Sequence, residues 1–178
     1  ISNIKNKFPI FSKKVNDKEL VYLDSAASAQ KPRIVLDALE KAYSETYANV
    51  HRGLHWLSET STEKYENVRN IVSKFLGAKS SNEIIYGYGA TYLINMVANS
   101  WGLKNLKPND EIIISVADHH ANIVPWQMVS HRTGSKIKAV KLNDLGEFDL
   151  DHFKSLVSEK TKVIAVPHVS NVLGSILP

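Results

Sequence analysis

Short apolar runs and helical apolar stripes alternate along most of this chain. The runs Glu111–Ser115 and 162–167 hold uncharged residues between polar ends, which is typical of strands that are buried on both faces. Apolar residues between such runs recur at helical spacing. We expect strands at 20–24, 83–86, 111–115, 136–142 and 162–167, and helices at 32–47, 60–76, 91–101, 121–132 and 149–157. The alternation predicts an α/β fold whose mostly parallel sheet is covered by helices on both faces.

The helix at 60–76 has the clearest end signals. Thr60 and Glu63 have the spacing of a capping box, and Gly77 supplies the left-handed conformation that ends many helices. Between these ends the apolar positions form one helical stripe. The stripe consists of Tyr65, Val68, Val72, Phe75 and Leu76.

Ligands of a parallel α/β sheet bind beyond the carboxyl ends of its strands, so the segments that follow the strands are the candidates for chemistry. The strand at 83–86 is followed by 87–92, where two glycines, Ala90 and Thr91 open a helix. Unpaired amides at a helix N-terminus, together with a hydroxyl group, suit a phosphate. The same residue types also begin helices for structural reasons alone.

Two adjacent histidines follow the strand at 111–115. The ring of His119 could lie against an aromatic ligand or transfer a proton near neutral pH, although a loop histidine bonded to the backbone is the simpler alternative. Adjacent His119 and His120 cannot share one helix face. His51 and His55 are four residues apart, but Gly53 lies between them and no carboxylate follows at a recognisable ligand spacing. We therefore predict no metal site.

Asn171 follows the strand at 162–167 and precedes a glycine-closed turn. Consecutive strands would then bring a phosphate-binding loop, an imidazole and an amide to one edge of the sheet. A phosphorylated aromatic cofactor needs that combination.

Composition narrows the function classes. The 178 residues carry a net charge of +4, and this excess lies in the first 18 residues, where five lysines face Asp17. The balanced remainder argues against nucleic-acid binding, and no apolar run is long enough to span a membrane. The chain contains no cysteine, which excludes a disulfide or a thiol nucleophile within it.

Several longer runs resemble the SufS-type (group II) cysteine desulfurases, which are fold-type I enzymes that use pyridoxal 5′-phosphate (PLP) and include selenocysteine lyases. The runs are Tyr22-Leu-Asp-Ser-Ala-Ala-Ser-Ala-Gln-Lys-Pro32, Ala48-Asn-Val-His-Arg-Gly53, Val97-Ala-Asn-Ser-Trp-Gly102, His119-His-Ala-Asn-Ile-Val-Pro-Trp-Gln127 and His168-Val-Ser-Asn-Val-Leu-Gly174. The resemblance implies removal of sulfur from L-cysteine, which gives L-alanine and an enzyme persulfide for iron–sulfur cluster assembly in the SUF system. It also implies a homodimer, a SufE- or SufU-type sulfur acceptor and a cytoplasmic location.

The resemblance also implies roles for particular residues. Ala90 and Thr91 match the positions that hold the PLP phosphate, and His119 matches the catalytic histidine that stacks on the pyridine ring. Asn171 matches the asparagine near the ring hydroxyl. Ala26 and Ala27 lie in a turn that matches the wall of the substrate pocket.

The chain departs from the family at two places. Tyr88 and Tyr92 stand where the family has Arg and Glu, which suggests that aromatic packing replaces a charged contact. The family's PLP-binding lysine and nucleophilic cysteine have no counterpart here. We expect an N-terminal arm at 1–24 and the N-terminal part of the large PLP-binding domain at 25–178, inactive alone. The alternatives are a truncated, non-catalytic paralogue that serves as a binding or dimerisation module, and a metal-dependent hydrolase built on the histidines.

Overall fold

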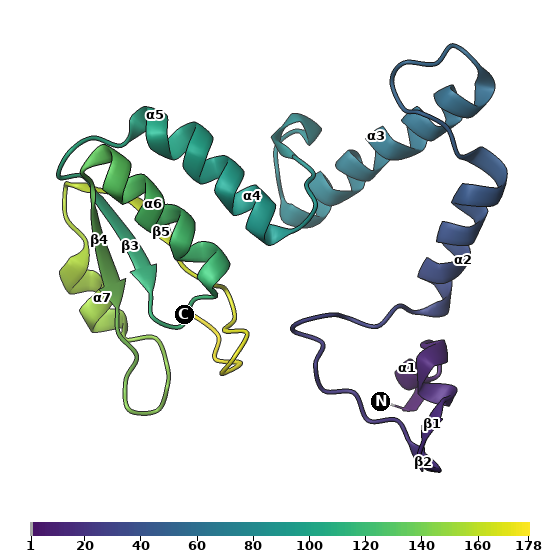
Figure 1. The fold of residues 1–178 in the computed structure, drawn as a ribbon, viewed down its shortest axis with the longest axis horizontal. Helices are drawn as coiled ribbons and strands as arrows, with labels where there is room; N and C mark the ends of the chain where they lie inside the picture. The colour runs from purple at the N-terminus through teal and green to yellow at the C-terminus, as the bar shows by residue number, and fades with distance from the viewer. Residues whose placement is uncertain (1) are drawn as a thin grey trace. The chain divides into compact units, whose positions relative to one another are not determined.

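The computed structural model describes residues 2–178 of the chain (Figure 1). Contacts between residues divide it into two compact units, Ile1–Ile85 and Tyr86–Pro178, which are described separately below. No helix in the described range is both long and apolar enough to cross a membrane.

The second unit contains a three-stranded parallel sheet. Its strands are β3 (Glu111–Ser115), β4 (Lys136–Val140) and β5 (Thr161–Ala165), in the spatial order β4-β3-β5. The arrows of β3 and β4 point the same way in Figure 1, so the carboxyl ends of the strands meet at one edge. The three strands predicted at 111–115, 136–142 and 162–167 are confirmed, with ends shifted by one or two residues. A parallel sheet with helices is the predicted fold class.

One face of this sheet forms the main core. Helices α5 (Leu103–Asn105) and α6 (Val124–Thr133) contribute to its cover, whereas the preceding helix, α4 (Ala90–Val97), has no buried residue. The π-helical segment Ala98–Gly102 joins α4 to α5, so the predicted helix at 91–101 continues further than expected. The buried apolar cluster consists of Ala98, Leu106, Ile112, Ile114, Trp126 and Val129.

The opposite face of the sheet is covered unevenly. Helix α7 (Leu150–Leu156) packs against β4, and Ile113 in the central strand is completely buried. Its register partner on β5, Ile164, is half exposed. Cover on this face therefore ends before β5 within the described residues.

An ion pair closes the covered part of this second face. Lys138 Nζ lies 2.8 Å from Glu111 Oε2, and the Ser158 hydroxyl donates to the same oxygen at 2.6 Å. These two hydrogen bonds, the one from Lys138 above all, hold the pKa of Glu111 below its usual value. The carboxylate thus joins β3, β4 and the turn after α7.

The first unit holds short N-terminal elements and two longer helices. Helix α1 (Ser2–Lys5) and the 3₁₀ turn Pro9–Ser12 precede a short hairpin. Its two strands, β1 (Lys14–Val15) and β2 (Lys18–Glu19), have two residues each. Helix α2 (Arg33–Lys41) continues into the π-helical segment Ala42–Thr46, and α3 spans Trp56–Leu76. Gly77 ends α3 with a positive φ of 70°, as predicted.

Two predicted strands are wrong. Residues 20–24 and 83–86 have no strand conformation: the side chains of Val21 and Leu23 are exposed, and 81–83 form a 3₁₀ turn. A strand exists only where a neighbour completes its hydrogen-bond ladder. Neither segment has such a neighbour among residues 2–178, so apolar composition alone overpredicted them.

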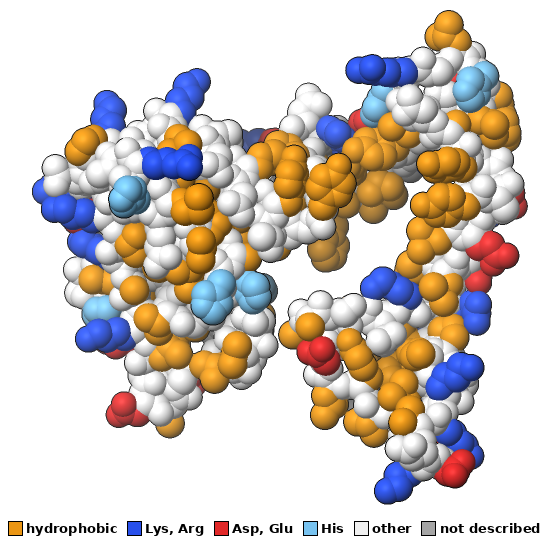
Figure 2. All heavy atoms as spheres, viewed as in Figure 1, with side chains coloured by type: hydrophobic (Ala, Val, Ile, Leu, Met, Phe, Trp, Pro, Cys, Tyr) orange, Lys and Arg blue, Asp and Glu red, His pale blue; other side chains and the backbone are white. Residues whose placement is uncertain are grey.

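The predicted start of α3 is also wrong. The helix begins one turn earlier, at Trp56, and its N-cap is His55, whose Nδ1 accepts the Ser58 N–H at 3.4 Å. Ser58 itself is fully buried and its hydroxyl donates to the Asn49 carbonyl, which fixes the helix start before Thr60. Much of the predicted stripe is exposed, and Figure 2 shows apolar side chains along α2 and α3.

Candidate functional site

The turn after β3 is held by its own polar side chains. Ser115, the last residue of the strand, is fully buried, and its backbone N–H donates to Asp118 Oδ2 at 3.2 Å. The Ser115 hydroxyl accepts the Ala117 N–H at 3.1 Å. The chain therefore leaves the sheet edge in a fixed direction just before His119.

His119 is exposed, and a local hydrogen bond orients its ring. Its Nδ1 accepts the backbone N–H of Ala121 at 3.0 Å, which makes His119 the N-cap of the 3₁₀ turn His120–Asn122. A neutral imidazole whose Nδ1 accepts carries its proton on Nε2. The geometry thus leaves an Nε2–H group on the free side of the ring.

A chain of hydrogen bonds links the same turn to the core. Asp118 Oδ1 accepts from Asn122 Nδ2, and Asn122 Oδ1 accepts from Trp126 Nε1, each at 3.2 Å. Burial raises the pKa of Asp118 above its usual value, while the hydrogen bonds from Asn122 and the Ser115 backbone lower it.

The segment before α4 has the geometry of an anion-binding loop. Gly89 has a φ of 145°, which a residue with a side chain rarely adopts, and a Cβ placed at Gly87 would lie 2.7 Å from Leu93 Cδ2. No side chain caps α4, and its first amides have no acceptor within the helix. Ala90 and Thr91 occupy this exposed first turn. Free amides beside a hydroxyl group fit a phosphate.

The aromatic residues on either side of this loop contact each other. The rings of Tyr88 and Tyr92 are 5.3 Å apart at an angle of 68°, an edge-to-face arrangement. The aromatic packing expected between these two positions is therefore present.

Asn171 lies at the tip of a tight hairpin after β5. The buried Ser170 holds this hairpin, because its Oγ accepts the N–H groups of Val172 and Leu173 and its carbonyl accepts the N–H of Gly174. The Asn171 side chain is exposed at the end of the sheet where β5 terminates.

Ala90, Thr91, His119 and Asn171 thus belong to one unit. Ala90 and Thr91 open α4, which precedes the sheet in sequence, so the expected phosphate loop does not follow a strand within the described residues. His119 and Asn171 follow β3 and β5, whose carboxyl ends share an edge, and α4 contacts the turn His120–Asn122. That the phosphate loop, the imidazole and the amide form one site remains a prediction. The donors fit PLP, which carries a phosphate and an aromatic ring.

Ala26 and Ala27 lie in the other unit. They are exposed in a turn in which Asp24 O accepts the N–H groups of Ala27 and Ser28. The Tyr22 hydroxyl donates to the Ser28 carbonyl at 2.5 Å and braces the same turn. Their predicted contact with substrate remains a prediction.

The two histidines considered for a metal have other partners. His55 caps α3, and His51 Nε2 lies 3.4 Å from Glu66 Oε1. Residues 2–178 contain no group of three or more histidine, cysteine, aspartate or glutamate side chains that could hold a metal ion.

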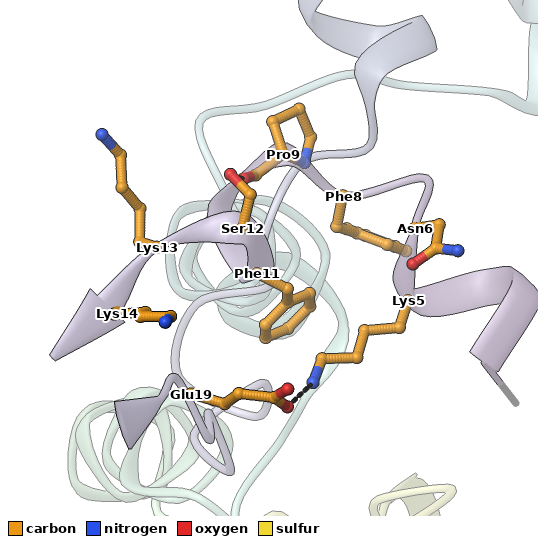
Figure 3. Close-up of a pocket in the computed structure, with 9 residues that line it drawn as sticks. All are labelled: Lys5, Asn6, Phe8, Pro9, Phe11, Ser12, Lys13, Lys14 and Glu19. Carbon is orange, nitrogen blue, oxygen red and sulfur yellow. Dashed lines mark hydrogen bonds and ion pairs between the residues drawn. The ribbon is translucent and has the colours of Figure 1, made fainter. Parts of the chain in front are cut away.

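A hollow of about 510 Å³ lies among the N-terminal elements (Figure 3). Lys5 reaches across it to Glu19, with 3.0 Å between Nζ and Oε2, and the rings of Phe8 and Phe11 form part of its wall. None of the predicted site residues lines it.

The sequence did not identify Asp118, Asn122 and Trp126 as parts of a site. Their spacing of four residues, on either side of a proline that opens a helix, is the signal that could have revealed them.

Comparison with known proteins identifies the family of this chain. Residues 21–178 match the aminotransferase class-V family. A probable cysteine desulfurase of Synechocystis is 52% identical over 99% of this chain and 42% of its own length. A cysteine desulfurase of Escherichia coli K12 is 49% identical over 98% of this chain and 43% of its own length.

Solved structures agree in fold. The apo cysteine desulfurase of Thermococcus onnurineus matches 99% of this chain and 42% of its own with a TM-score of 0.88 and 32% identity. The Escherichia coli cysteine desulfurase CsdA matches 99% of this chain and 43% of its own with a TM-score of 0.81 and 38% identity. The chain therefore spans less than half the length of these relatives, and it belongs to the aminotransferase class-V family, with the fold of its PLP-dependent cysteine desulfurases.

Proposed function

We propose that this chain supplies the PLP-binding edge of a cysteine desulfurase. The observation that carries the proposal is the junction of two features in one unit: the uncapped start of α4 after Gly89, and the oriented ring of His119 after β3. Ala90 and Thr91 would hold the phosphate, His119 would lie against the pyridine ring, and Asn171 would approach the ring hydroxyl.

The proposed reaction takes L-cysteine to L-alanine and transfers its sulfur to a thiol of the enzyme, which becomes a persulfide. Bound PLP withdraws electrons from the substrate and so weakens bonds at its α- and β-carbons. The 178 residues contain no cysteine, so the accepting thiol comes from outside them. Ala26 and Ala27 would line the substrate pocket.

The residues of this chain bind and orient, and one of them moves a proton. The amides at the start of α4 and the Thr91 hydroxyl would donate hydrogen bonds to the phosphate. Because Nδ1 of His119 is occupied by the Ala121 N–H, proton transfer would take place at Nε2.

The finer assignment rests on the motif resemblance alone. We place the protein with the group II desulfurases that serve iron–sulfur cluster assembly, acting as a cytoplasmic homodimer that delivers sulfur to a SufE- or SufU-type acceptor. Selenocysteine is expected as a second substrate, because selenium replaces sulfur at the same position of the amino acid.

The test titrates PLP into the full-length protein and follows the visible absorbance of the bound cofactor. Thr91→Val and His119→Ala should each raise the Kd for PLP about tenfold, the size of a lost hydrogen bond or ring contact to a charged ligand. His131→Ala, at an exposed position of α6, is the matched control and should leave the Kd unchanged.

Assays with L-cysteine then separate the enzyme from a binding module. Release of alanine in step with sulfur supports the desulfurase. Tight PLP binding without alanine would favour a non-catalytic module, and absence of PLP binding would refute the proposal.

A further inference from the structure

The hydrogen-bond chain beside His119 has a direction that chemistry fixes. Trp126 Nε1 can only donate, so the atom of Asn122 that faces it must be the amide oxygen. The amide nitrogen of Asn122 therefore points at Asp118, whose other carboxylate oxygen accepts the Ser115 N–H. Each member of the chain has one compatible orientation.

The anchor of this chain is rigid. Trp126 is almost completely buried in the core cluster, where it packs with residues of β3. Ser115 at the other end is the fully buried last residue of β3. The series of hydrogen bonds thus connects two buried residues, Ser115 and Trp126, and spans the segment that carries His119.

His119 lies between the members of this chain and depends on the same backbone. The donor to its Nδ1 is the N–H of Ala121, adjacent to Asn122, and the Asn122 N–H donates to the His119 carbonyl at 2.8 Å. A shift of Asn122 would therefore move the group that decides which imidazole nitrogen carries the proton.

We propose that Asp118 is a positioning residue for His119: through Asn122 and Trp126 it fixes the turn so that His119 Nδ1 accepts from Ala121, its Nε2–H stays available for proton transfer and its ring is oriented to lie against the ligand. The inference rests on the proposed function for the identity of that ligand, PLP. The partial burial that raises the pKa of Asp118 makes its charged carboxylate costly to keep there, and the hydrogen bonds from Asn122 and Ser115 offset part of this cost.

The test exchanges donor and acceptor in the hydrogen bond between positions 118 and 122. Asp118→Asn still offers an oxygen to the Ser115 N–H, but its amide then meets the amide nitrogen of Asn122, and two donors oppose each other. The double variant Asp118→Asn/Asn122→Asp restores a complete chain, because the carboxylate introduced at position 122 accepts from position 118 and from Trp126.

The first readout is the tautomer of His119, from ¹⁵N spectra of the full-length protein labelled in histidine and assigned with His119→Asn. Wild type should show the Nε2–H form. Asp118→Asn should lower the ratio of the two tautomers about fivefold, the effect of one net hydrogen bond, and the double variant should return it to the wild-type value. Should Asp118→Asn fail to fold, Asn122→Ala breaks the same chain without opposing donors and should shift the ratio likewise.

A tautomer ratio that stays unchanged in a folded variant with a broken chain would overturn the proposal, as would a double variant that does not recover. The second readout is the Kd for PLP, expected to rise about fivefold in Asp118→Asn and to recover in the double variant; an unchanged Kd beside a shifted tautomer would also overturn it. The tautomer readout needs no cofactor and so tests the role of Asp118 separately from the proposed function. A wild-type protein that failed to bind PLP would contradict the proposed function, and the ¹⁵N spectra would still decide whether Asp118 orients the ring.

Discussion

Ile113 and Ile164 offer a matched pair of substitutions, because they are register partners on adjacent strands of one sheet face. Ile113 is completely buried, whereas Ile164 is 50% exposed. We expect Ile113→Ala to lower the free energy of unfolding by about 3.5 kcal/mol, the sum of lost transfer energy and the cavity left in a closed site.

Ile164→Ala should cost about 1 kcal/mol, since about half of the transfer energy is lost and an open site leaves no cavity. The difference of about 2.5 kcal/mol corresponds to about a seventyfold difference in the ratio of folded to unfolded protein.

Urea unfolding followed by circular dichroism and tryptophan fluorescence measures both variants, and agreement of the two signals checks that unfolding is a single transition. Losses that agree within about 0.5 kcal/mol would refute the reasoning. Such a result would mean that Ile164 is covered in the folded protein and that the sheet face over β5 is not open.

Three further predictions follow from particular contacts. Lys138→Met removes the main cause of the lowered pKa of Glu111, whose stabilising contribution is present above pH 4.5 and is lost as pH falls through the lowered pKa. The acid-induced loss of stability, measured by unfolding at several pH values, should therefore be smaller in the variant. An unchanged pH profile would contradict the pairing of Lys138 with Glu111. Gly102→Ala places a Cβ 3.3 Å from Trp126 Cζ3, in a ring that is buried and hydrogen-bonded. Crowding should therefore outweigh the gain in helix preference and lower the free energy of unfolding in urea by about 1 kcal/mol. A stabilised variant would show that the ring can move. Tyr88→Arg breaks the ring contact with its neighbour and should leave desulfurase turnover unchanged or lower, so that a marked gain would refute the view that aromatic packing replaces a charged pair here.

The sequence predicted the strands of the second unit better than those of the first. The reason is that the strands of the second unit have their pairing partners within the same unit. The apolar run of β3 pairs with β4 on one side and with the apolar run of β5 on the other, all inside one unit, so that local pattern and tertiary context agree. Residues 20–24 have an equally apolar pattern, but no strand within 2–178 completes their ladder. Pattern reveals that a segment suits a strand; only the neighbour decides whether it becomes one.

In the candidate site, too, the sequence indicated some features and missed others. Motif resemblance indicated His119, Thr91 and Asn171. The structure places His119 and Asn171 after β3 and β5, and Thr91 at the start of α4, which contacts the turn His120–Asn122. The link from Asp118 to Trp126 was missed because hydrogen-bond direction depends on which atoms face each other, and spacing alone does not carry that information.

The strand order β4-β3-β5 also determines when the sheet can form as the chain is synthesised. Glu111 pairs with Lys136 at a separation of about 25 residues, whereas Ile112 pairs with Val163 at about 50, so the loop closed by β5 is about twice as long. At a synthesis rate of about 5–20 residues per second, β3, α6 and β4 leave the ribosome more than a second before β5 is complete. During that interval the free edge of β3 is open to a strand from another nascent chain, and a slower passage through 141–160 would lengthen the time in which misassembly competes with folding.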